Sequence, residues 1–332
     1  MSSAPTAEEI WKDARWLAQA VDPRAGLVRL VEMTPEDYRN ASFLDDRMFE
    51  RPRTSHLVQW DAVAGSVPGP ARTDARWIFH IGHVGSTLIA RLLGELDCVL
   101  SVREPRSLRD LTFFPPDVQA GFGPTLKALL SRTFAPDQTA LIKATSFVSE
   151  IAAELIGSDR ALFLYASPAN YIASILAGEN SRKELAGMAQ MRGQRLASRG
   201  ISLRQPRNEA EAAAIAWACE TTTLESADGP NVRWADFDRA LDDLEGFLLS
   251  MAQLFGFAAS PDELRSIANG PLTRRYSKAT EFEYSPGLRR ELLGEATGRN
   301  QAEIESALAM LDAASETAPL LRNALNRAQA ES

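Results

Sequence analysis

Five short apolar runs mark the middle of the chain, and stretches with helical spacing separate them. The runs are bounded by turn residues and lie at 77–81, 99–102, 140–142, 161–165 and 232–234. Short apolar runs that alternate with amphipathic segments indicate βαβ units. The pattern therefore predicts an α/β fold of three layers, in which a central parallel sheet carries helices on both faces.

The first 60 residues show a different hydrophobic pattern. Apolar residues recur at intervals of three and four over residues 7–21, which predicts one amphipathic helix. The recurring positions are Ile10, Ala14, Leu17 and Val21. Residues 27–31 are typical of a short strand, and Thr34 followed by Pro35 is typical of a helix start.

Three parts follow from these patterns. Residues 1–60 are predicted to form an N-terminal helical subdomain, and residues 51–76, rich in Pro, Gly, Ser and Arg, are predicted to be a linking loop. Residues 77–257 form the predicted α/β core. Residues 258–332 have mostly helical spacing and are predicted to be a C-terminal helical extension that packs on the core.

Composition narrows the class of function. The 332 residues include 36 Lys and Arg against 44 Asp and Glu, for a net charge of −8. This acidic balance disfavours a nucleic-acid partner. Two cysteines cannot form a disulfide framework, and with three histidines they are too few and too scattered for a zinc site, so we expect no metal.

Neither a signal peptide nor a membrane helix is predicted. The N-terminus is polar and then acidic, without the basic start and apolar stretch of a signal peptide. The longest uncharged run, 161–178, is interrupted by Ser167-Pro168-Ala169-Asn170, which breaks a helix. The run therefore predicts strand, turn and helix, and we expect a cytoplasmic protein without membrane contact.

The stretch 77–96 carries the clearest chemistry. An apolar strand leads into Gly82 and Gly85, and the hydroxyl pair Ser86-Thr87 then opens a helix. Glycines let backbone N–H groups approach an anion, and a helix N-terminus adds partial positive charge. The stretch predicts a phosphate cradle; the alternative is a tight strand–helix turn in which the glycines are needed only sterically.

This loop differs from the nucleoside-triphosphatase pattern because no Lys precedes Ser86. That Lys normally neutralises the β and γ phosphates of a triphosphate. A donor that places a single phosphate in the loop depends less on it.

The loop resembles the 5′-phosphosulfate loop of the sulfotransferase family, in which Lys or Arg precedes Ser-Gly-Thr-Thr. The resembling run is His83-Val84-Gly85-Ser86-Thr87-Leu88. Further segments resemble the family in the right order, at 99–105, 140–145, 162–174 and 232–237. The resemblance covers roughly residues 77–257. It implies a P-loop-like sulfotransferase architecture and 3′-phosphoadenylyl sulfate as the co-substrate.

Two family positions are changed. The family usually has a basic residue where this chain has His83, and an Arg for the donor's 3′-phosphate where it has Ala166; Ser174 is kept. Basic residues at 182–207 and 273–290 are candidate replacement cations, because local positive patches steer anions. The predicted donor-binding residues are Gly82, Val84, Gly85, Ser86, Thr87, Ser174, Arg274, Arg275 and Lys278.

Three residues are candidates for catalysis. Glu104 follows a strand at the carboxyl edge of the sheet, where it can accept the acceptor's proton; the alternative is a surface pair with Arg103 or Arg106. His83 can stabilise the charge that develops on the bridging oxygen. Lys143 can reach the sulfuryl group or pair with a carboxylate.

Three functions therefore stay open. The first is transfer of a sulfuryl group from 3′-phosphoadenylyl sulfate to a hydroxyl or amine of a small-molecule or peptide acceptor. The second is a P-loop phosphotransferase that uses a nucleoside triphosphate with Mg²⁺. The third is a non-catalytic binding protein with the same fold. The sequence leaves open whether the chain forms a homodimer.

Overall fold

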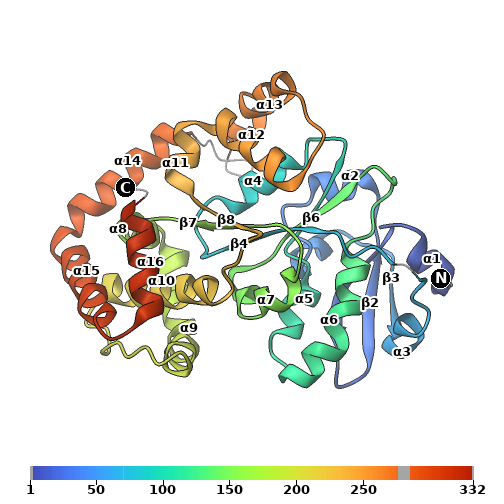
Figure 1. Cartoon of the computed structure of the whole chain (residues 1–332), viewed down its shortest axis with the longest axis horizontal. Coiled ribbons are helices and arrows are strands. Elements are labelled where there is room, and N and C mark those ends of the chain that lie inside the picture. The colour runs from blue at the N-terminus through green and yellow to red at the C-terminus, as the bar shows by residue number, and fades with distance from the viewer. Residues whose placement is uncertain (1–2, 70, 276–284, 331–332) are drawn as a thin grey trace.

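Two sheets organise the computed structural model, which describes residues 3–69, 71–275 and 285–330 (Figure 1). The larger sheet has five strands in the order β5-β6-β4-β7-β8, and the smaller has three in the order β1-β2-β3. All neighbours in the larger sheet pair in parallel, whereas those in the smaller sheet pair antiparallel. The chain thus has the predicted α/β fold.

Each predicted apolar run of the core is a strand of the parallel sheet. The strands are β4 (Arg76–His80), β5 (Val99–Arg103), β6 (Thr139–Lys143), β7 (Ala161–Tyr165) and β8 (Val232–Asp236). Every residue of β5 and β7 is buried. A strand covered on both faces needs such a continuous run, so these predictions are confirmed.

Helices cover both faces of this sheet. The helical elements of the core are α4 (Ser86–Leu93), α5 (Arg106–Leu111), α6 (Pro116–Leu130), η2 (Ser146–Ile151), α7 (Ala152–Ile156), α8 (Pro168–Leu176), α9 (Glu179–Ser198) and α10 (Glu209–Ser226). α4 packs on one face against β4, β5 and β6, and α10 packs against β4 from the other face (Figure 1). η2 also packs against β4. The three predicted layers are present.

Strand order places a topological switch point at the centre of the sheet. From β4 the chain crosses to β5 on one side, and from β7 it crosses to β8 on the other, although β4 and β7 are neighbours. Ligands of open α/β sheets bind at the carboxyl ends of strands where the connections diverge in this way. The glycine loop leaves β4 at this point.

The N-terminal region is a small antiparallel sheet with short helices and not the helical subdomain predicted for residues 1–60, and two further predictions are wrong here. Its elements are α1 (Ala7–Lys12), β1 (Trp16–Asp22), β2 (Leu27–Glu32), α2 (Pro35–Asn40), η1 (Asp46–Glu50), β3 (Ser55–Gln59) and α3 (Trp60–Ala64). The helix predicted over 7–21 ends at Lys12, and the loop predicted over 51–76 contains β3 and α3. All of β1 except Asp22 is buried, so apolar residues occur at every spacing along it, including three and four.

The predicted helix start at Thr34 is confirmed. The Thr34 hydroxyl accepts from the Asp37 N–H, and the Asp37 carboxylate accepts from the Thr34 N–H, which completes a capping box. The carboxyl end of the same helix is held from the core, because the buried Arg103 guanidinium donates to the carbonyls of Tyr38, Arg39 and Ala41. Burial lowers the pKa of Arg103 to about 9. A buried cation on otherwise unpaired helix carbonyls thus joins α2 to β5.

The last third is helical, as predicted, over the residues described. It contains α11 (Phe237–Asp242), α12 (Leu244–Phe255), α13 (Pro261–Ala268), η3 (Pro271–Arg274), α14 (Pro286–Arg299), α15 (Gln301–Ser315) and α16 (Pro319–Ala330). α15 and α16 pack on α10, and α14 packs on α8. The boundaries predicted for the three parts stay a prediction. Within the described ranges, none of the helices has the length and apolar character needed to span a membrane.

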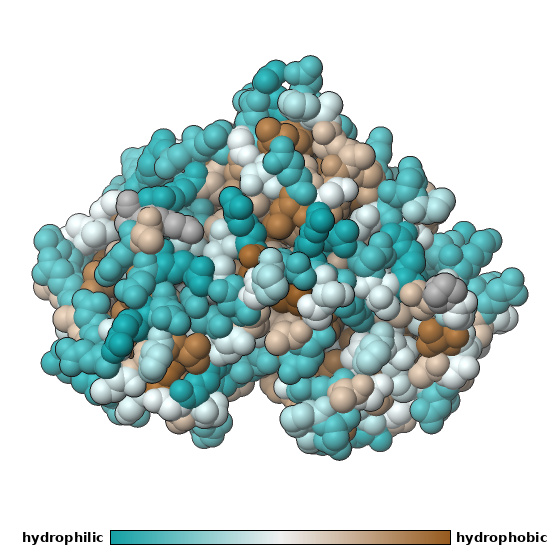
Figure 2. All heavy atoms as spheres, in the orientation of Figure 1, coloured by the Kyte–Doolittle hydropathy of each residue, from teal (hydrophilic) through white to brown (hydrophobic). Residues whose placement is uncertain are grey.

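The surface in this view is mostly hydrophilic, with small apolar patches between charged side chains (Figure 2). An indentation lies at its lower edge, between the positions of α9 and α6 in Figure 1.

Candidate functional site

The glycine loop connects β4 to α4 with three residues in the left-handed backbone region. Their φ angles are 82° at Gly82, 55° at His83 and 60° at Gly85, which caps α4. A Cβ added to Gly85 would lie 1.9 Å from the nearest ring atom of Phe237, so only glycine fits there. Ser86 and Thr87 are buried in the first turn of α4, where the sequence placed the hydroxyl pair.

Backbone strain singles out two of the candidate catalytic residues. Within the described ranges, only His83 (φ 55°) and Glu104 (φ 52°) combine a side chain with positive φ. The left-handed region costs an L-residue about 1–2 kcal/mol, and such strain concentrates at functional sites. This observation does not depend on the motif that first pointed to these residues.

Glu104, Lys143 and Thr87 come together in a buried cluster. The Lys143 ammonium donates to Glu104 Oε1 and lies 3.4 Å from Thr87 Oγ1. The Glu104 N–H donates to the Lys143 carbonyl at 2.7 Å, which extends the pairing of β5 with β6 by one residue. Lys143 is fully buried and Glu104 is 8% exposed. The cluster thus places a carboxylate and an ammonium beside the N-terminus of α4.

Arg47, from the N-terminal region, is a cluster member that the sequence did not predict. Its guanidinium lies 3.1 Å from Glu104 Oε2 and makes three hydrogen bonds to the Asp45 carboxylate, at 2.8, 3.1 and 2.6 Å. It also stacks on the ring of Phe43, 3.3 Å from the ring centre. Burial raises the pKa of Asp45, but the hydrogen bonds and positive charge of Arg47, with the charge of Arg109, together outweigh burial and leave the pKa below its usual value. The adjacent acids and arginine at 45–47 were visible in the sequence, but nothing local pointed to Glu104.

The alternative prediction, that Glu104 forms a surface ion pair with Arg103 or Arg106, is wrong. Arg103 is turned toward the end of α2, and Arg106 pairs with Asp46 and Asp110. Glu104 is paired instead with Lys143 and Arg47, in a buried position.

His83 lies against α8 and α9. Its Nδ1 is 3.5 Å from the Ser181 hydroxyl, and its ring is edge-on to Tyr171 with centroids 6.5 Å apart. Gly82 and His83 also border a small cavity of about 20 Å³. The loop therefore has two environments: the buried charges at Thr87, and this small cavity at His83.

The residues predicted to hold the donor's 3′-phosphate are dispersed. Ser174 lies on α8, where its hydroxyl donates to the Tyr171 carbonyl at 2.9 Å. Arg274 and Arg275 are exposed at the end of η3, which packs against α4. Lys278 lies outside the described residues. The role of these four residues stays a prediction.

The positive charge of the basic stretch 182–207 is largely neutralised by acidic residues that lie beside it in the structure. Each of its seven cations forms an ion pair, mostly with an acid from another segment. The pairs are Arg182 with Glu209, Lys183 with Glu179, Arg192 with Glu220, Arg195 and Arg199 with Glu150, and Arg204 and Arg207 with Glu211. The excess charge counted along the sequence is thus offset in space, and most of this stretch joins α9 and α10 to their neighbours.

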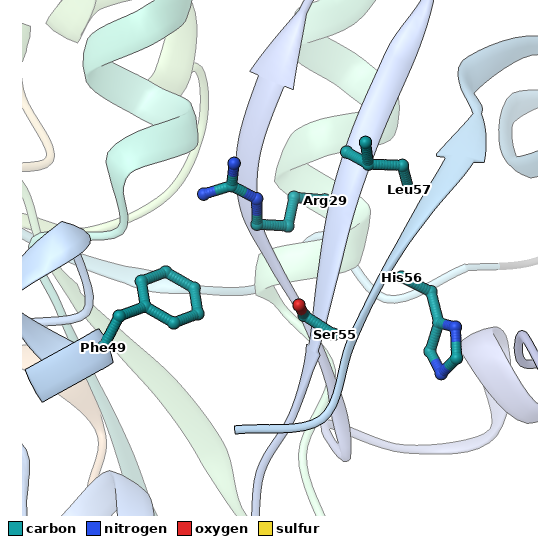
Figure 3. Close-up of a pocket in the computed structure, with 5 residues that line it drawn as sticks. All are labelled: Arg29, Phe49, Ser55, His56 and Leu57. Atoms are coloured by element: carbon teal, nitrogen blue, oxygen red, sulfur yellow. The ribbon is translucent and has the colours of Figure 1, made fainter. Parts of the chain in front are cut away.

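Two larger cavities lie away from the cluster. One of about 570 Å³ is an open depression on the N-terminal sheet, lined by Arg29, Phe49, Ser55, His56 and Leu57 (Figure 3). The other, of about 580 Å³, lies between α8, α11 and α14 and includes Asn170, Asp238 and Arg289. Arg289 pairs with Asp238 at 2.6 Å and lies 5.0 Å from the centre of the Phe237 ring, which touches Gly85. The Phe237 ring thus contacts both Arg289, which lines this second cavity, and Gly85 of the glycine loop.

No cation site is evident: across the described ranges, no group of three or more His, Cys, Asp or Glu side chains is placed to hold a metal ion.

Comparison with known proteins adds little beyond the geometry. No family model matches the chain, and no curated protein matches it. Among solved structures, it is similar to a sulfotransferase domain from the Curacin biosynthetic pathway, with 13% identity and a TM-score of 0.37. The likeness covers 68% of this chain and 86% of that one. A likeness this distant carries no argument about function.

Proposed function

We propose that this protein is a sulfotransferase-like enzyme that moves a sulfuryl group from 3′-phosphoadenylyl sulfate to a hydroxyl or amine acceptor. The observation that carries the proposal is the buried cluster of Glu104, Lys143 and Thr87 at the N-terminus of α4. It combines an anion-binding helix end, a cation and a candidate base within hydrogen-bonding distance of one another.

Each residue has a distinct task in the proposed reaction. Glu104 accepts the proton of the acceptor group as the acceptor oxygen or nitrogen bonds to sulfur. The bond between sulfur and the bridging oxygen breaks, and the electron pair stays on the leaving phosphate. Lys143 and the N-terminus of α4 neutralise that phosphate, and His83 donates a hydrogen bond to the bridging oxygen.

The donor's nucleoside is proposed to lie beyond Phe237, in the cavity between α8, α11 and α14. A volume of about 580 Å³ is within the range of small-molecule sites. Arg289 lines this cavity and supplies a positive charge for an anionic ligand there. Ser174, Arg274, Arg275 and Lys278 remain the proposed partners of the 3′-phosphate.

Calorimetry with 3′,5′-adenosine bisphosphate, in buffer containing EDTA, tests the proposal. We expect saturable binding, weakened about tenfold in Thr87→Val, which keeps the side-chain shape but removes the hydroxyl beside Lys143. Thr112→Val, at the end of α5, is the matched control and should bind as the unaltered protein does. Absence of binding at millimolar nucleotide would overturn the proposal, and Mg²⁺-dependent binding of ATP in its place would favour a phosphotransferase.

A further inference from the structure

Arg47 is the solvent-exposed partner of the buried Glu104 carboxylate. The Glu104 side chain is 10% exposed, and its Oε1 contacts the fully buried Lys143. Its Oε2 contacts Arg47, whose side chain is 49% exposed. Arg47 is therefore the cation of this pair that a molecule from solution can reach, and an acceptor that gives its proton to Oε2 has to lie against it.

The Arg47 guanidinium has bonding capacity that the chain does not use. Its Nε and Nη2 donate to Asp45, and Nη2 is also the atom that lies 3.1 Å from Glu104 Oε2. Among the described residues, no hydrogen bond is made by Nη1. A half-exposed guanidinium with unused N–H groups can bind a further acceptor atom without leaving Asp45.

Arg109 is a second cation near this point, and it lacks an acid of its own. It follows Arg106 by three residues on α5, so the two side chains leave neighbouring positions on one face of the helix. Arg109 interacts electrostatically with Asp45 and Asp46, but within the described ranges its side chain forms no hydrogen bond or ion pair. Both acids have a nearer cation, which is Arg47 for Asp45 and Arg106 for Asp46. The positive charge of Arg109 is therefore available to a ligand.

We infer that the acceptor carries a carboxylate close to the hydroxyl or amine that receives the sulfuryl group, and that Arg47 and Arg109 bind this carboxylate. The inference rests on the proposed function, because Glu104 as the base fixes where the acceptor's nucleophile lies. A guanidinium binds a carboxylate through two parallel hydrogen bonds. A single negative charge suits this place better than the two charges of a phosphate, because Asp45 and Glu104 already lie on the Arg47 guanidinium and repel further negative charge.

Binding of matched probes to the complex with 3′,5′-adenosine bisphosphate tests the inference. The probes are 4-hydroxyphenylacetate with its neutral counterpart tyrosol, and 3-hydroxybutyrate with its neutral counterpart butane-1,3-diol. We expect calorimetry to show that the charged member of at least one pair binds about tenfold more tightly than the neutral member. Arg47→Gln and Arg109→Gln should each reduce this preference by about fivefold or more, because each removes one of the charged donors.

Further variants separate the loss of binding from a loss of folding. Arg47→Lys keeps the charge but loses the paired donors, so it should retain more of the preference than Arg47→Gln. Arg39→Gln removes an exposed arginine that pairs with Asp97, and this matched control should not change the preference. The Arg109→Gln change breaks no side-chain hydrogen bond or ion pair of the described residues, so it decides the question even if thermal unfolding shows that Arg47→Gln does not fold.

The outcomes separate this inference from the donor proposal. Three results would overturn the inference and leave the donor proposal standing: equal affinity for the charged and neutral probes, no binding of either hydroxy acid at millimolar concentration, or a preference that survives in every folded glutamine variant. If the nucleotide itself does not bind, the donor proposal is wrong. The same probes are then measured with the protein alone, where the same results decide whether the carboxylate site exists.

Discussion

Glu104 and Glu211 are both buried carboxylates with two cationic partners, but the two sites are built differently. Glu211, in the first turn of α10, is fully buried and accepts hydrogen bonds from Arg204, Arg207 and Ser306, and also from the Arg207 N–H at 2.7 Å. These bonds, led by that of Arg204, hold the pKa of Glu211 far below its usual range. Its backbone is ordinary helix, and its partners join α10 to α15 and to the preceding segment.

Glu104 has fewer bonds and a strained backbone. Its side chain contacts Lys143 and Arg47, its φ is 52°, and it lies beside a helix N-terminus. The comparison teaches that buried charge alone does not mark a functional carboxylate. A site that is saturated with hydrogen bonds on relaxed backbone stabilises the fold, whereas strained backbone is more frequent at functional sites, which is why we propose a catalytic role for Glu104 and not for Glu211.

The largest expected effect is on sulfuryl transfer, which should depend on Glu104 and not on Glu211. Glu104→Gln should lower sulfuryl transfer by about 10²–10⁴-fold, because the acceptor proton loses its base. The same change leaves Lys143 buried without its carboxylate, so stability falls as well. Single-turnover release of 3′,5′-adenosine bisphosphate measures the first effect, and thermal unfolding measures the second.

A double variant then divides the two effects. Glu104→Gln combined with Lys143→Met should recover most of the lost stability without restoring transfer, because the uncompensated charge is gone but the base is still missing. Transfer at the level of the unaltered protein in Glu104→Gln would show that Glu104 is as structural as Glu211.

The next largest effect is expected at Glu211, whose carboxylate is saturated with hydrogen bonds. Glu211→Gln should lower the free energy of unfolding by about 2 kcal/mol, because the two guanidinium groups lose the negative charge and one acceptor oxygen of their buried partner. Nucleotide affinity should not change. The pKa of Glu211 is lowered in the folded state, so its contribution is present above the ordinary value of 4.5 and is lost as pH falls below it. Denaturant unfolding between pH 7 and pH 3 should therefore show a shallower acid decline in the variant; an identical decline would contradict this role.

The smallest effect tests the strain. His83→Gly should raise the free energy of unfolding by about 0.5–1 kcal/mol, because glycine adopts positive φ without strain but loses more entropy on folding. Gly200→Ala is the matched control, because it introduces a side chain where the backbone has positive φ. The φ of Gly200 is 71° and open space surrounds it, so a decrease of about 1 kcal/mol in the free energy of unfolding would reflect backbone strain alone. Denaturant unfolding measures both. A loss of stability in His83→Gly would mean that the histidine contributes more to the fold than its backbone costs.

The sequence was informative wherever the signal was local. The five core strands are short apolar runs between turn residues, and the loop at 82–87 combines glycines with a helix start. The pattern failed at β1, because a strand covered on both faces has no alternation that distinguishes it from a helix. The sequence also could not show that the cations of the basic stretch 182–207 are paired. Their acidic partners include Glu150 and Glu220, which lie outside this stretch in the sequence.

By itself, the sequence determined the α/β class, the position of the glycine loop and the presence of Glu104 and Lys143 at strand ends. These features depend on periodicity and backbone preference, which act between near neighbours in the chain. Only the tertiary structure decided that Lys143 pairs with Glu104 and that Arg47 joins this pair, although it lies 57 residues from Glu104 in the sequence. Such pairings depend on how distant segments pack, and charge along a chain carries no information about which opposite charge folding will bring beside it.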